Sequence, residues 1–245
     1  MKIKRDILLI TAGLVLVGSF FLPNMEAGVM DARRLDRIIT VGAQSISIST
    51  DTVFGLPQRI ALAASPNTEM LALTAGQVMG TETAKARAAR ELARFFRGDL
   101  FDSSADDYTV EDGVTTLVTD SGDPSVNLIM WEFRAVDRQN NEMTVTIDDE
   151  TGMILKLIYQ QRDGGAISGG TAGEDDSGLF SGDMNGTAQR LTEMMTAYYG
   201  LTVRLGDYQF GNGLAYYRAD MYGGGQVIYM YGVVRVNGFT MNERV

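Results

Sequence analysis

Two Asp-Ser-Gly segments are the residues of this chain whose type and spacing most resemble a catalytic motif. They cover Asp120 to Gly122 and Asp176 to Gly178. Paired carboxylates that share a proton activate water in aspartic proteases, where this tripeptide carries them. Both segments also have the composition of turns, and the second lies in a Gly-rich stretch. We interpret them as turns and predict neither a catalytic residue nor an enzyme.

Acidic residues gather in two further places, at residues 102–112 and 174–183. Their oxygens are the ligands that Ca²⁺ prefers, but neither cluster has the spacing of a helix–loop–helix calcium loop. We interpret them as solvated loop charge and predict no metal and no cofactor. A carboxylate pair can also hydrolyse sugars, and 31 acidic residues leave that open. A carboxylate-dependent hydrolase of cell-wall sugars or peptides is therefore the alternative function.

The missing residue types exclude several chemistries. The chain has no cysteine and no histidine. It therefore lacks the side chains normally needed for thiolate nucleophiles, iron–sulfur ligation, His-dependent catalytic triads and His-dependent zinc sites. A Ser–Lys dyad or a Schiff base would depend on Lys85 or Lys156. The net charge of −10 repels phosphate backbones, so we expect no nucleic-acid partner.

Tyrosines are concentrated toward the C-terminal end of the chain. Tyrosine suits a half-buried strand, and it also provides large, rigid contact area in interfaces. Both interpretations remain open, because alternate residues of a strand face opposite sides. Tyr229 and Tyr231 should share a face, as should Tyr208 and Phe210. As binding residues we predict Tyr208, Tyr217, Tyr229, Tyr231 and Trp131.

The N-terminus has the pattern of a membrane anchor. Basic residues precede an uncharged run over 7–22, which Pro23 ends. Its length lies between that of a signal-peptide core and that of a spanning helix. We predict a signal anchor over residues 1–24 that meets the lipid bilayer through 7–22, with the C-terminal part extracytoplasmic. Secretion after signal cleavage is the alternative.

The next residues, 25–75, are predicted to form a membrane-proximal stalk and the first strands. The alanine-rich segment 81–97 predicts the best helix of the chain, with Gly98 as its stop. The segment 126–136 is apolar on both faces, which indicates a central strand. Residues 25–40 and 56–64 predict further helices, and further strands are predicted at 45–52, 70–73, 115–119, 143–147 and 154–159.

Residues 163–182 are rich in Gly, Ser and acidic side chains, as in a flexible linker. Beyond it, a helix is predicted at 187–199 and strands at 202–210, 214–221 and 226–236. The two halves thus have the same order of elements. We predict an α+β fold of tandem modules, 76–162 and 183–245, each a helix with its own small antiparallel sheet.

Residues 81–160 resemble PepSY-type modules, in which an alanine-rich helix precedes a sheet with a Thr-Gly turn. The resemblance rests on the helix, the Trp131 strand and the segment Val145 to Leu157, VTIDDETGMILKL. Residues 56–96 also resemble uncharacterised membrane-anchored proteins of low-GC Gram-positive bacteria. The resemblance implies a PepSY/cystatin-like fold and an extracytoplasmic accessory role, without catalytic residues.

We therefore expect a membrane-anchored extracytoplasmic binding or regulatory module that acts on a partner protein or envelope component. The composition supports this indirectly, because the chain lacks the side chains on which most catalytic mechanisms depend. A structural subunit of an envelope complex is the remaining alternative.

Overall fold

A computed structural model describes residues 55–97, 104–162, 184–235 and 237–243. These residues contain three α-helices, one short 3-10 helix and ten strands. The helices are α2 (Leu56–Ala64), α3 (Thr81–Phe95), η1 (Ala105–Asp107) and α4 (Met184–Tyr199). The strands are β1 (Thr68–Leu73), β2 (Tyr108–Val110), β3 (Val114–Asp120), β4 (Asn127–Asp137), β5 (Glu142–Asp148), β6 (Ile154–Gln160), β7 (Thr202–Gly211), β8 (Leu214–Gly223), β9 (Gln226–Arg235) and β10 (Gly238–Met241).

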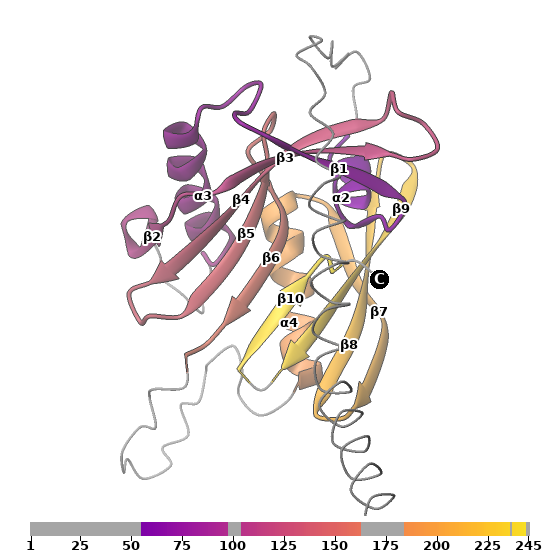
Figure 1. The fold of residues 1–245 in the computed structure, drawn as a ribbon. Coiled ribbons are helices and arrows are strands. Elements are labelled where there is room, and N and C mark those ends of the chain that lie inside the picture. Colours follow the sequence, from indigo (N-terminus) through magenta and orange to yellow (C-terminus); the bar gives the residue numbers. More distant parts are fainter. Residues whose placement is uncertain (1–54, 98–103, 163–183, 236, 244–245) are drawn as a thin grey trace, which may run out of the picture. The chain divides into compact units, whose positions relative to one another are not determined.

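All ten strands belong to one antiparallel sheet, in the order β1-β3-β4-β5-β6-β10-β9-β8-β7, with β2 also paired to β4. Figure 1 shows β10 beside β6, which joins the strands of the two halves. The prediction of an α+β fold with two small separate modules is therefore wrong. Sheet predominates in the described residues, and it is continuous across both halves.

The pairing of β6 with β10 explains why the halves merge. Each is the last strand of its meander and would otherwise expose unpaired backbone groups at an edge. Pairing places Phe239 opposite Tyr159 and Met241 opposite Leu157, and all four side chains are buried. The rings of Tyr159 and Phe239 stack 5.6 Å apart. The junction thus satisfies backbone hydrogen bonds and buries apolar surface together.

Helices α3 and α4 bury their apolar stripes against the sheet. Leu92 and Phe95 of α3 and Leu191 of α4 are almost fully buried. Phe95 meets Tyr198 of α4 with ring centres 5.4 Å apart. The helices also share a polar contact, because the Tyr198 hydroxyl donates to Glu91 over 2.6 Å. We call the side of the sheet that these helices cover the core face.

Helix α2 lies at the end of the sheet beyond the short β10, where it contacts both β6 and β9. Asn242 follows β10 and fastens the helix there. Its side-chain nitrogen donates to the carbonyl oxygens of Ile60, at 3.0 Å, and Leu155, at 2.8 Å. The predicted strand at 126–136 is β4, and it does lie inside the sheet, between β3 and β5.

The prediction of a single-pass membrane protein with a signal anchor and an extracytoplasmic part is also corrected. None of the helices in the described residues is long and apolar enough to cross a membrane. The longest, α4, has 16 residues, and its polar side chains interrupt the apolar ones. The run at 7–22 lies outside the described residues, as do the stalk helix 25–40, the strand 45–52, the linker 163–182 and Asp176 to Gly178.

Candidate functional site

Strands β8 and β9 present exposed tyrosines on the side of the sheet opposite the core face. Along β8, Ala215, Tyr217, Ala219 and Met221 are buried, while the alternate Tyr216 and Tyr222 are 51% and 40% exposed. On β9, Tyr229 and Tyr231 are 53% and 41% exposed. We call the set Tyr216, Tyr222, Val227, Tyr229 and Tyr231 the tyrosine face.

Arginines hold some of these rings in place. Arg218 lies over the ring of Tyr229, with its guanidinium carbon 4.9 Å from the ring centre, and Arg204 lies over Tyr222 at 5.5 Å. Such contacts are attractive because the face of the ring is electronegative. Arg218 is itself oriented by two carboxylates: its Nε donates to Asp220 over 2.7 Å, and it also pairs with Asp207. The hydrogen bond that Arg218 donates to Asp220 raises the pKa of Arg218, which favours its charged form.

A hollow of about 550 Å³ opens beside Tyr216, Arg218 and Tyr231, within the size range of ligand pockets. It is lined by residues of β7, β8 and β9 together with Glu243, among them Tyr216, Tyr231, Val233 and Arg235. The tyrosine face is therefore contoured, with Tyr216 and Tyr231 among the walls of the hollow.

The structure separates the tyrosines predicted as binding residues. Tyr229 and Tyr231 lie on the tyrosine face. Tyr208 is only partly buried and lies opposite Tyr217 in the sheet, on the core side. Tyr217 is 3% exposed, and burial raises its pKa. Its hydroxyl donates to the carbonyl oxygen of Thr240 over 3.2 Å.

Sequence reasoning missed Tyr216 and Tyr222. The signal that finds them is the strict alternation of β8, where small or buried residues occupy every second position. Gly232 explains why Tyr217 takes an inward position: a Cβ at this glycine would collide with the Tyr217 ring. The ring thus covers the glycine of the neighbouring strand.

Trp131 is buried on the core face, 2% exposed, and does not reach the tyrosine face. Its indole nitrogen donates to Asp149 Oδ1 over 2.7 Å, and its ring stacks on Phe133 with centres 5.8 Å apart. Asp149 also accepts backbone N–H bonds from Gln77, Val78 and Met79. This arrangement fastens the segment before α3 to the sheet.

The buried carboxylates of the described residues are all engaged in structural contacts. They are Glu91, Asp148 and Asp149. Asp148 binds Arg59 of α2 at 3.2 Å and accepts from the Thr151 hydroxyl at 2.6 Å. None of the three lines the hollow beside Tyr216 and Tyr231. A hydrolase would need two facing carboxylates in a pocket, one of them desolvated, and these side chains do not supply that arrangement.

Asp120 to Gly122 forms the turn after β3. Asp120 Oδ1 accepts N–H bonds from Gly122, at 2.8 Å, and Asp123, at 3.0 Å. This is the local turn chemistry of aspartate. The part of the chain that the structure describes also holds no group of three or more acidic side chains placed to bind a metal ion.

Comparisons with protein-family models, with curated proteins and with solved structures found no match to this chain. They give no support to the resemblance with PepSY-type modules.

Proposed function

We propose that this protein is a binding module that docks a partner protein on its tyrosine face. The observation that carries the proposal is the concentration of exposed tyrosines, with Val227, on two adjacent strands. Tyrosine and arginine are enriched in protein interfaces, whereas lysine is depleted. Strands β7, β8 and β9 contain three arginines and no lysine, which fits that composition.

The rigidity of the face favours binding further. Tyrosine has few rotatable bonds, and the stacked Arg218 and Arg204 restrict two of the rings before any partner arrives. A side chain that is already ordered loses little entropy on association. A regular sheet beneath the rings also fixes their spacing, which gives the face a defined shape.

The test is the joint substitution of Tyr229→Ser and Tyr231→Ser in the full chain. Affinity purification with the unmodified protein supplies a candidate partner, and the dissociation constant is then measured with that partner purified. We expect the double variant to bind at least about a hundredfold more weakly, the loss typical of two aromatic residues central to an interface.

The matched control is Phe210→Ser. Phe210 is 66% exposed, but its register opposite Ala215 places it on the core side of the sheet. This variant removes one exposed aromatic ring from the other side of the sheet and should keep the affinity of the unmodified chain. A partner that binds the double tyrosine variant as tightly as the unmodified protein would overturn the proposal.

A further inference from the structure

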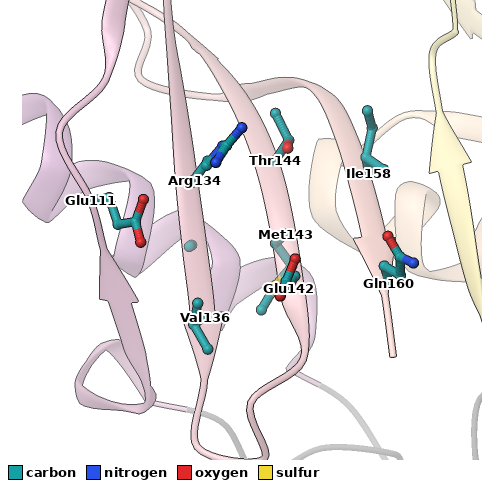
Figure 2. Close-up of a pocket in the computed structure, with 9 residues that line it drawn as sticks. Glu111, Arg134, Val136, Glu142, Met143, Thr144, Ile158 and Gln160 are labelled. Atoms are coloured by element: carbon teal, nitrogen blue, oxygen red, sulfur yellow. The ribbon is translucent and has the colours of Figure 1, made fainter. Parts of the chain in front are cut away.

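A second hollow, of about 320 Å³, lies on the same side of the sheet as the tyrosine face but in the first half of the chain. Its walls come mainly from β4, β5 and β6 (Figure 2). The register shows that the two hollows share a side. Across neighbouring strands, Arg134, Thr144, Ile158, Thr240, Val233 and Tyr216 form one continuous row.

Three charged side chains line this second hollow: Arg134, Glu111 and Glu142. Figure 2 shows Arg134 on β4 with Glu111 on one side and Thr144 on the other, while Glu142 stands further along β5. The backbone places Glu111 there, because its N–H donates to the carbonyl oxygen of Arg134 over 2.9 Å. One positively charged and two negatively charged side chains therefore line the same cavity.

None of these three side chains forms an ion pair with another described residue. Arg218, in the second half of the same side of the sheet, has two carboxylate partners instead. Arg134 thus keeps its planar set of donors available for a carboxylate. Glu111 and Glu142 likewise keep acceptors available for an ammonium group.

We propose that this hollow binds the zwitterion of a free α-amino acid. Its carboxylate would meet Arg134, and its ammonium group would meet Glu111 and Glu142. A simple anion is disfavoured by the two glutamates and by the chain's net charge of −10. A simple cation is disfavoured by Arg134. A ligand that carries both charges close together satisfies all three groups.

The remaining walls fit the rest of such a ligand. Val136 and Ile158 offer apolar surface for an aliphatic side chain, and Thr144 and Gln160 add hydrogen-bonding groups at the rim. The volume is at the small end of the range for ligand pockets, which suits a molecule of this size. The site uses no residue of the tyrosine face, so the two proposals can fail separately.

The experiment is calorimetric titration of the full chain with L-leucine, followed by a panel of other free amino acids. N-acetyl-leucine lacks the ammonium charge and leucinamide lacks the carboxylate. We expect L-leucine, or another member of the panel, to bind with millimolar or tighter affinity. The two blocked probes of the bound amino acid should each bind at least about tenfold more weakly, since each loses one charge-assisted contact.

Two variants test which charged group of the amino acid each side chain contacts. Arg134→Gln should weaken amino-acid binding at least about tenfold. Glu142→Gln should weaken it too, while improving binding of the N-acetylated probe, a reversal that a merely unstable protein would not show. Arg90→Gln is the control, because Arg90 is exposed on α3 and bonds only to Ala86 within its own helix.

Three results would overturn the proposal. They are no binding by any free amino acid at about 10 mM, equal binding of the blocked probes, and unchanged affinity in Arg134→Gln. Trp131 fluorescence verifies that each variant is folded, since this is the chain's only tryptophan and it is buried.

Discussion

Asp149 shows how one buried side chain ties distant segments of this protein together. Its carboxylate accepts three backbone N–H groups from residues 77–79 and the indole N–H of Trp131. Gly76 is required beside it, because a Cβ there would collide with Asp149 and with Trp131. A buried carboxylate with four donors is stable only while all of them stay in place.

Asp149→Ala should therefore lower the free energy of unfolding by roughly 3 kcal/mol or more, because four donors lose their charged acceptor. Urea denaturation followed by Trp131 fluorescence measures the change, and the emission of the folded variant should shift to the red. Asp123→Ala is the control, since Asp123 bonds only within an exposed turn. Equal losses in the two variants would contradict this account of Asp149.

At the scale of elements, Gly113 allows β2 and β3 to follow one another along the same edge of β4. A Cβ at Gly113 would collide with the carbonyl oxygen of Glu132 and with the ring of Phe133. Because Gly113 has no Cβ, the backbone that connects β2 to β3 can lie close against β4. This close approach also sets the position of Glu111, two residues earlier, beside Arg134.

Gly113→Ala should destabilise the protein by about 1–3 kcal/mol, because a well-packed strand must shift to admit the methyl group. The midpoint of urea unfolding measures it. Gly211→Ala is the control: Gly211 is the last residue of β7, and nothing lies within 4 Å of its added Cβ. A variant at Gly113 as stable as the one at Gly211 would show that the backbone there yields freely.

For the whole molecule, buried tyrosines in both halves make stability depend on alkaline pH. Burial raises the pKa of Tyr159, Tyr198, Tyr199 and Tyr217 above the ordinary value near 10. The unfolded chain therefore releases protons above pH 10 that the folded chain keeps. The contribution is fully present below about pH 10 and is lost as the pH rises further.

We expect the free energy of unfolding to fall above about pH 10 by up to about 1.4 kcal/mol per pH unit for each such group. Urea unfolding at pH 8 and 11 measures the fall. Trp131 fluorescence and tyrosine near-UV circular dichroism should report one midpoint, because a single sheet joins the halves. Tyr217→Phe should make the free energy of unfolding depend less steeply on pH in this range. Two separate midpoints would argue against a single cooperative sheet.

Local patterns of the sequence predicted most elements well. The alanine-rich segment 81–97 is α3, the segment 126–136 is β4, and the pair Tyr229 and Tyr231 does share a face. Each of these features depends on periodicity within a few residues, which the chain carries locally. The short β10 was not predicted, because its four residues show no clear alternation of polar and apolar side chains.

The tertiary structure alone decided how the elements assemble and which aromatic residues are buried. The sequence determined that each half is a helix followed by strands, but the pairing of β6 with β10 depends on residues far apart along the chain. Likewise, the aromatic character of Trp131 and Tyr217 is compatible with a place in the core and with a place in an interface. Their burial follows from Asp149 and Gly232, which only long-range packing brings beside them.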